Sequence, residues 1–326
     1  MTTVSNVIKK RTDRVSKEKT ELIEGIVKKY NYSPNMNARS LVNSSSNLIG
    51  LLYHSVDFSD PFVSELLEGI EERAKELGYF ILVYNIESLE DVVAVQQNWK
   101  FEGFIVVGVL EKLFDPIQKK IPEDVPVVFV DTHLSEDLKA KVETLSERFF
   151  IASADEKSGY DAAKFLLEQG HKQIGFLSFK FNECENGVIN ERFQGFKRAI
   201  NEFGHRFNER LVFNEQEFDR VANNKDSFTA LVVSADFLAV KLIHYLRQRG
   251  LYDKEKLSIV GFDDVSYAKY LEPPLTTIRL NQKNKGTKAI ELLSEAIQNQ
   301  PIEKFILLPG ELVVRESVKS LNQNRE

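Results

Sequence analysis

The chain has 326 residues, of which 42% are hydrophobic and 28% are charged, an ordinary composition for a globular protein of two or three domains. It contains one cysteine, Cys184, which excludes an internal disulfide and a metal site made of cysteines alone. It has no apolar run of about 18 residues and no apolar leader, so we expect a cytoplasmic protein without a membrane span.

Charge is distributed unevenly along the chain. Residues 1–46 carry nine Lys or Arg and four acidic side chains, a net charge of +5, which leaves −11 on the rest of a chain whose total is −6. A small basic segment on an acidic body favours contact with a polyanion. The alternative is a solvated helical face rich in lysine.

An apolar stripe opens the chain, with Val4, Val7 and Ile8 at positions i, i+3 and i+4 of a predicted helix. A second helix begins after Ser16, which we expect to be its N-cap, and its apolar positions keep helical spacing as far as Tyr30. The polar face of the first helix consists of Thr2, Thr3, Ser5, Asn6, Lys9 and Lys10.

The segment that follows predicts a turn at 32–35, a short helix at 37–42 and a polar linker at 43–47. We therefore place a helical head at 1–46 and the body of the protein at 47–326.

In the body, apolar runs of strand length alternate with amphipathic helices. Near-continuous apolar strands between helices predict parallel sheets that are covered on both faces, an α/β fold. Four such units before about residue 150 and at least three after it predict two sheets. The strand runs are 48–53, 79–84, 103–109, 125–131, 174–179, 229–235 and 257–264, and the helices include 62–77, 159–169, 192–203 and 237–249.

Catalytic signatures are absent from the sequence. There is no phosphate-binding glycine loop, no H-E-x-x-H pair and no G-x-S-x-G elbow. The five histidines are far apart, and His171 lies in a predicted helix-to-strand connection, where we expect a structural role. We therefore predict no catalytic residue, no metal site and no cofactor.

Two predicted strands end in acidic residues. Asp263 follows the run at 257–262, and Asp236 follows the run at 229–235. Ligands of open α/β sheets bind beyond the carboxyl ends of the strands, and a carboxylate there can accept hydrogen bonds from two hydroxyl groups. For Asp236, which precedes a helix, N-capping is the stronger alternative.

Two further residues are candidate ligand contacts. Arg192 opens a predicted helix, where its charge would oppose the helix dipole, and this suggests a role in binding a pair of ligand oxygens. We expect its replacement to weaken ligand binding without affecting the fold; a surface ion pair is the alternative. Phe62 follows the first strand, where it would either stack on a ligand or pack into the core.

These segments together resemble the LacI/GalR group of bacterial transcription regulators over nearly the whole chain. One segment alone is weak evidence, but six or more in the same order and spacing are specific. They are TTVSNVI with DRVS, YNYSPNMNARSL, DPFVSELLEGIEERAKELGY, GHKQIGFL, RFQGFKRAI, VSADFLAV, LSIVGFDD and PPLTTIR. The resemblance implies a helix-turn-helix head, a hinge helix and a two-lobed periplasmic-binding-protein-like core. Such cores dimerise and bind a sugar or another small effector that shifts DNA affinity.

The resemblance also implies the residues that meet DNA. Thr2, Thr3, Ser5 and Asn6 would face the major groove, with Lys9 and Lys10 near phosphates and Asn35, Ala38, Arg39 and Leu41 at the hinge. The first helix of the family's head is missing, so the helix-turn-helix is incomplete. We expect the missing helix to be encoded upstream of Met1. The alternative is a degenerate head that binds DNA weakly. Without that helix, the stripe at Val4 would face water.

Two positions depart from the family pattern at the effector site. Ala235 stands where many relatives carry Asn, and Leu280 aligns with a Gln that touches the effector in some sugar-responsive relatives. Both changes remove a polar partner, which suggests an unusual sugar, a less polar molecule or no effector.

The sequence therefore predicts a homodimeric repressor of carbohydrate-use genes that binds double-stranded operator DNA. Its effector would be a sugar or sugar phosphate, bound by Phe62, Arg192, Asp236 and Asp263. The main alternative is a sugar-binding module without DNA activity, and an enzyme is a distant third.

Overall fold

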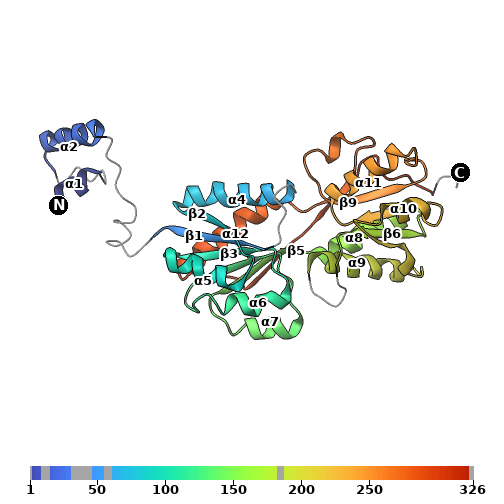
Figure 1. Cartoon of the computed structure of the whole chain (residues 1–326), viewed down its shortest axis with the longest axis horizontal. Helices are drawn as coiled ribbons and strands as arrows, with labels where there is room; N and C mark the ends of the chain where they lie inside the picture. Colours follow the sequence, from blue (N-terminus) through green and yellow to red (C-terminus); the bar gives the residue numbers. More distant parts are fainter. Residues whose placement is uncertain (1, 9–14, 31–45, 55–60, 182–186, 323–326) are drawn as a thin grey trace. The chain divides into compact units, whose positions relative to one another are not determined.

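The computed structural model describes residues 2–8, 15–30, 46–54, 61–181 and 187–322 (Figure 1). The chain divides into two compact units, Met1–Asn47, here called the head, and Leu48–Glu326, here called the core. The boundary lies one residue after the predicted one.

The described part of the head contains two helices, α1 (Thr2–Ile8) and α2 (Lys17–Lys29). Ser16 is the N-cap residue of α2, as predicted, although its side chain accepts no capping hydrogen bond. Glu18 in the first turn and two lysines in the last turn complement the dipole of α2.

The apolar positions of the head are mostly exposed. Val7 is buried, with 4% of its surface exposed, but Val4 is 46% exposed. In α2, Leu22 is 64% and Ile26 is 49% exposed, and no residue of this helix is buried. Apolar surface of the head therefore faces water, as expected from the sequence.

The core consists of two lobes, each built on a six-stranded sheet. Lobe 1 has the strand order β11-β5-β4-β3-β1-β2, and all of its neighbouring strands are parallel. The strands are β1 (Leu48–Tyr53), β2 (Phe80–Asn85), β3 (Gly103–Val107), β4 (Val127–Val130), β5 (Arg148–Ser153) and β11 (Phe305–Leu308).

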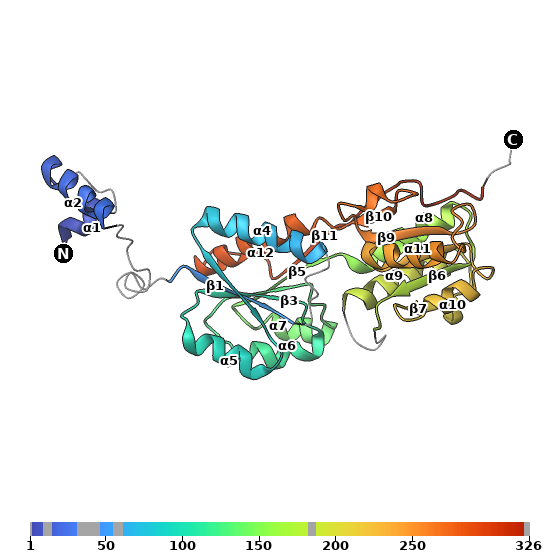
Figure 2. The same cartoon turned by 45° about the horizontal axis from the view of Figure 1, so that its top comes forward.

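Helices cover both faces of the sheet of lobe 1 (Figures 1 and 2). One face packs on α4 (Pro61–Leu77) and α12 (Gln282–Ile297) through Leu51, Ile70 and Leu293, among others. The opposite face packs on α5 (Leu89–Asn98), α6 (Glu111–Gln118) and α7 (Glu136–Val142).

Lobe 2 has the strand order β12-β10-β9-β8-β6-β7, with only the β10–β12 pair antiparallel among its described strands. The strands are β6 (Ile174–Ser178), β7 (Val212–Asn214), β8 (Ala230–Val233), β9 (Ser258–Asp263), β10 (Thr276–Arg279) and β12 (Glu311–Val313). Its helices are α8 (Asp155–Glu168) and α9 (Val188–Glu202) on one face, α10 (Phe218–Asn223) and α11 (Asp236–Gln248) on the other, and the short 3-10 helices η2 (Glu209–Leu211) and η3 (Ala268–Tyr270).

The predicted α/β fold with two parallel sheets is confirmed, and all seven predicted strand runs contain strands. The prediction that one sheet forms before residue 150 and the other after it was incomplete. After β10 the chain returns to lobe 1 to form α12 and β11, and then crosses to lobe 2 again for β12. Within the described residues, the lobes are therefore joined by three crossings: β5 to α8, β10 to α12, and β11 to β12.

A search of the described residues for membrane-spanning segments finds no helix with sufficient length and apolar character.

Candidate functional site

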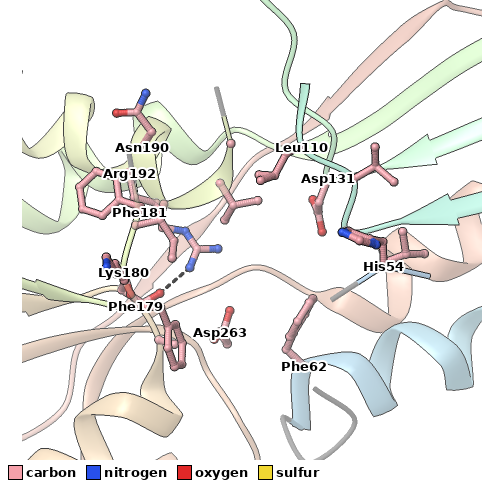
Figure 3. Close-up of a pocket in the computed structure, with 18 of the residues that line it drawn as sticks. His54, Phe62, Leu110, Asp131, Phe179, Lys180, Phe181, Asn190, Arg192 and Asp263 are labelled. Carbon is pink, nitrogen blue, oxygen red and sulfur yellow. Dashed lines mark hydrogen bonds between the residues drawn. The ribbon is translucent and has the colours of Figure 1, made fainter. Parts of the chain in front are cut away.

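A cavity of about 680 Å³ lies between the two lobes (Figure 3). Its lining comes from the carboxyl ends of strands in both sheets. His54 follows β1 and Asp131 follows β4 in lobe 1, while Ser234 follows β8 and Asp263 ends β9 in lobe 2. This is the position at which open α/β sheets bind ligands.

Apolar side chains form much of the wall. Phe62 and Leu110 line the cavity from lobe 1, and Phe179, Phe181 and Phe237 line it from lobe 2. Phe62, at the start of α4, is half-buried and faces the cavity, so the structure permits the predicted contact with a ligand. Aromatic walls of this kind bind rings and apolar faces of small molecules.

Arg192 is the central cation of the cavity. It is 6% exposed, and its Nε donates a hydrogen bond to Oδ1 of Asp155 at 2.8 Å. Its Nη1 donates to the backbone oxygen of Ser234 at 2.5 Å, and its guanidinium lies 4.6 Å from the ring centre of Phe262. The prediction that Arg192 opens its helix was wrong, because α9 begins at Val188 and Arg192 lies one turn inside it. The surface ion pair is also excluded, since the pair with Asp155 is buried.

Asp155 connects Arg192 to the other lobe. This carboxylate is the first residue of α8 in lobe 2, and its Oδ2 lies 3.0 Å from Nε2 of His133, which follows β4 in lobe 1. Burial raises the pKa of Asp155, but the charge of Arg192 and the hydrogen bond with His133 outweigh it, so the pKa lies below its ordinary value of 3.8. The carboxylate is therefore ionised and holds Arg192 in place.

Asp263 lies on the same cavity as Arg192, as predicted. It is 7% exposed, and its backbone has a φ of 104°, in the left-handed region that is rare for residues other than glycine. Its negative charge contributes to raising the pKa of Arg192. Such backbone strain persists only where surrounding structure enforces it, and it is commonly found at ligand sites.

Asp236 does not line the cavity, which corrects its prediction as an effector contact. It is completely buried, and its carboxylate accepts hydrogen bonds from the backbone N–H of Val265 at 3.1 Å and from Oγ1 of Thr277 at 2.7 Å. The N-cap of α11 is Ala235, so N-capping does not explain Asp236 either. Burial and the charge of Asp263 raise its pKa well above its ordinary value of 3.8. Its role is to tie α11 to β9 and β10.

Asp131 and Lys285 form an ion pair that the sequence analysis missed. Nζ of Lys285 lies 2.7 and 2.9 Å from the two carboxylate oxygens of Asp131, and Lys285 is 1% exposed. Asp131 ends an apolar strand run, which is the same signal that identified Asp263. Lys285 lies in α12, 154 residues away along the chain, and nothing in the local sequence connects the two.

The two residues that depart from the family pattern lie in different parts of lobe 2. Ala235 lines the cavity, whereas Leu280 packs in the apolar core of lobe 2 and does not. Gln282, two residues later, does line the cavity.

His171 has the structural role that its position predicted. It is 1% exposed, its Nδ1 lies 2.8 Å from Oγ1 of Thr229, and its Nε2 lies 3.0 Å from the backbone oxygen of Lys319. Burial lowers its pKa below the ordinary value of 6.5.

The predicted DNA contacts lie in or near the head. The structure places Thr2, Thr3, Ser5 and Asn6 on α1, with Thr3 exposed and Asn6 half-buried. The other predicted contacts lie outside the described residues: Lys9, Lys10, Asn35, Ala38, Arg39 and Leu41.

Among the described residues, no group of three or more His, Cys, Asp or Glu side chains is placed so that it could hold a metal ion.

Sequence comparison relates the whole chain to known repressors. Residues 163–318 match the family described as periplasmic binding protein-like domain. The HTH-type transcriptional repressor PurR of Vibrio vulnificus is 31% identical, with 98% of this chain and 96% of that protein covered. The PurR repressor of Photobacterium profundum is 30% identical over the same shares.

Structural comparison supports the same fold. The lac repressor dimer bound to operator and the anti-inducer ONPF matches with a TM-score of 0.82 at 22% identity, covering 97% of this chain and 94% of that one. A complex of the transcriptional regulator CelR with cellobiose matches with a TM-score of 0.72 at 22% identity, covering 97% and 95%.

Proposed function

Because the chain belongs to the LacI/GalR family of transcription regulators, we propose that it represses carbohydrate-use genes by binding operator DNA as a homodimer. A sugar-like effector bound in the cavity between the lobes would change its affinity for the operator. The relatives are transcriptional repressors, and the related structures include one bound to operator and one bound to cellobiose.

The observation that carries the proposal is the pair of Arg192 and Asp263 on the wall of one cavity. Arg192 is fixed by Asp155 and by the backbone of Ser234. A fixed guanidinium and a carboxylate supply a donor and an acceptor on the lining of one cavity, which suits the hydroxyl groups of a sugar. The aromatic walls suit its apolar ring faces.

On the DNA side, we propose Thr2, Thr3, Ser5 and Asn6 as groove contacts and Lys9 and Lys10 as phosphate contacts. The hinge contacts are Asn35, Ala38, Arg39 and Leu41. The net charge of +5 on residues 1–46 supports this assignment, since phosphate contacts dominate the affinity of proteins for DNA.

The experiment is a titration of the full chain with a panel of sugars, followed by DNA binding with the sugar that binds. Asp263→Asn should weaken sugar binding, while Asp137→Asn, which changes an exposed acid on α7, should not. Sugar binding without any sequence-specific DNA binding would favour the alternative of a sugar-binding module. Unchanged sugar affinity in Asp263→Asn would show that Asp263 does not contact the sugar.

A further inference from the structure

A contact between His133 and Asp155 joins the two lobes next to their first crossing. His133 lies three residues after the end of β4 in lobe 1, and Asp155 is the first residue of α8 in lobe 2. Nε2 of His133 and Oδ2 of Asp155 are 3.0 Å apart, and the two side chains are 11% and 0% exposed. Because solvent hardly reaches this contact, salt screens it much less than an ion pair on the surface.

His133 is fixed to lobe 1 by its neighbours in the chain. Thr132 and Leu134 are buried, and Leu134 packs in the apolar core of that lobe. Two residues before His133, the carboxylate of Asp131 accepts hydrogen bonds from Nζ of Lys285 at 2.7 and 2.9 Å. The segment that carries His133 therefore moves with lobe 1.

Asp155 is fixed to lobe 2 in a similar way. Its Oδ1 accepts a hydrogen bond from Nε of Arg192 at 2.8 Å, and Nη1 of Arg192 donates to the backbone oxygen of Ser234. Arg192 lies in α9 and Ser234 follows β8, both in lobe 2. Since each partner is held by its own lobe, the contact between His133 and Asp155 depends on how the lobes lie relative to each other.

The surroundings of the His133 ring favour its protonated form. Burial lowers its pKa, but the hydrogen bond and charge of Asp155 and the charges of Asp131 and Glu191 outweigh burial, so the pKa lies above 6.5. The cations nearest to these carboxylates are bound to them: Arg192 to Asp155, and Lys285 to Asp131.

Two of the three carboxylates that act on His133 belong to the other lobe. Asp155 is in α8 and Glu191 is in α9, whereas Asp131 is in lobe 1 with His133. If the lobes moved apart here, the ring would lose the hydrogen bond and two of the negative charges, and its pKa would fall. A proton therefore binds more tightly in the arrangement with the contact, and by linkage it favours that arrangement.

We propose that His133 and Asp155 form a pH-sensitive contact, here called the latch, that holds the lobes together when His133 is protonated and releases them when the ring is neutral. The ring exchanges its proton with solvent, while Asp155 keeps its charge beside Arg192. The latch concerns the core alone, but its consequence for operator binding rests on the proposed function. Protons would then bias the same lobe arrangement on which a bound effector acts.

The test measures the lobe arrangement of the full chain by single-molecule FRET from about pH 6 to about pH 9, on either side of an ordinary histidine pKa. Dyes are attached at Glu71→Cys in α4 and Asn201→Cys in α9, both exposed positions, in a chain with Cys184→Ser. Excess unlabelled chain keeps both dyes of a pair on one chain. No DNA or sugar is added, so the result is independent of the proposed function.

Three variants separate the latch from other effects. His133→Gln can still hydrogen-bond to Asp155 but does not titrate, and His133→Phe keeps a ring of similar size without any hydrogen bond. The matched control is His244→Gln, which removes an exposed histidine of α11 in lobe 2.

In the unmodified chain and in His244→Gln, the ratio of the low-pH arrangement to the other should fall about fivefold or more as pH rises. The ratio in His133→Gln should not change with pH. His133→Phe should show at every pH the ratio that the unmodified chain reaches at high pH. If neither variant of His133 folds, the midpoint in the unmodified chain must coincide with the titration of the His133 ring followed by NMR.

A ratio that is independent of pH in the unmodified chain would overturn the inference. So would a pH dependence that persists in His133→Gln or does not coincide with the titration of His133. Another group would then be responsible, such as Glu65 of α4, whose pKa is raised by burial and by the charges of Glu68 and Asp264.

Discussion

The buried pair of Arg192 and Asp155 has consequences for stability as well as for ligand binding. Sequence alone led us to expect that replacing Arg192 would leave the fold intact. In the structure, the replacement would take away the charge partner of a carboxylate that has no access to solvent and would leave it only the contact with His133. We therefore predict that Arg192→Met lowers the free energy of unfolding by about 3–5 kcal/mol, measured by urea denaturation.

The double variant Asp155→Asn with Arg192→Met is the control for this prediction. It removes both charges, and the Asn side chain can still hydrogen-bond to His133, so part of the lost stability should return. If Arg192→Met is as stable as the unmodified chain, the pair does not matter to the fold.

His133 should make stability depend on pH. Burial lowers its pKa, but the hydrogen bond and charge of Asp155, with the charges of Asp131 and Glu191, outweigh this, so its pKa is raised above 6.5. Protonated His133 thus stabilises the folded state fully below about pH 6.5, the unfolded value, and the contribution is lost as pH rises through the folded pKa.

We predict that the contribution of protonated His133 to the free energy of unfolding declines as pH rises from 6.5, and that His133→Gln removes this decline. His171 does not contribute to this decline. Its pKa is lowered, so its titration changes the free energy of unfolding only below about pH 6.5. Urea denaturation of both chains across this range is the measurement. If the free energy of unfolding falls with pH equally steeply in His133→Gln, another titrating group causes the decline.

The residues of the site differ in how far sequence could predict them. Asp263 was predicted from a local signal, the end of a strand, whereas Arg192 was selected because of a helix start that lies four residues earlier in the structure. Asp131 carries the same strand-end signal and could have been found. Asp155 and Gln282 could not, because their roles depend on partners from distant parts of the chain.

At the level of elements, α8 and α9 cross at a pair of glycines that hold Arg192 in position. A Cβ atom on Gly159 would lie 1.9 Å from the backbone oxygen of Arg192, and one on Gly195 would lie 1.8 Å from that of Glu156. The two helix backbones are thus in direct contact.

We predict that Gly159→Ala lowers the free energy of unfolding by about 1–3 kcal/mol, because the helices must separate, and that it weakens effector binding by moving Arg192. Urea denaturation and calorimetry provide the two measurements. The control is Gly25→Ala in α2, where a Cβ would meet nothing within 4 Å; it should leave effector binding unchanged. If Gly159→Ala is destabilised but binds the effector with normal affinity, the contact between α8 and α9 does not influence effector binding.

The segment 37–42, outside the described residues, supports a prediction about DNA. It is too short to be a stable helix alone, since isolated helices under about 12 residues are marginal in water. Two copies paired on DNA would place Leu41 as an apolar wedge in the minor groove. We predict that Leu41→Ala weakens operator binding far more than binding to random DNA.

Fluorescence anisotropy on operator and random duplexes would measure the difference. The salt dependence should change little, because phosphate contacts are untouched, and the dimer and the melting temperature of the core should persist. Equal losses on both duplexes, or dissociation to monomers, would assign Leu41 to packing.

Elements with strong apolar periodicity were predictable and others were not. Strands such as β1 and β9 are continuous apolar runs buried on both faces. β7 and β12 have only three residues each, too few to show a pattern. The start of α9 was misplaced because the residues from Val188 to Glu191, which precede Arg192, already belong to the helix.

At the scale of the whole molecule, the three crossings between the lobes are the connections through which a bound ligand could change the lobe arrangement. Asp155 lies at the first crossing and holds Arg192, which lines the candidate site, while Gln282 lies at the second crossing and lines the site itself. The return of α12 to lobe 1 could not be predicted from apolar patterns, because an amphipathic helix has the same spacing in either lobe. A ligand that binds residues of both lobes favours one lobe arrangement over others by its difference in affinity for them.

We expect a molecule bound in the cavity to change the affinity of the chain for a specific DNA sequence. The most direct test is fluorescence anisotropy of a duplex selected from random DNA by the full chain, titrated with and without a saturating saccharide that raises its melting temperature. We expect a palindromic duplex and a change in Kd of about 5- to 150-fold on adding the saccharide. Equal Kd values in both titrations, or a selection that enriches no sequence, would contradict it.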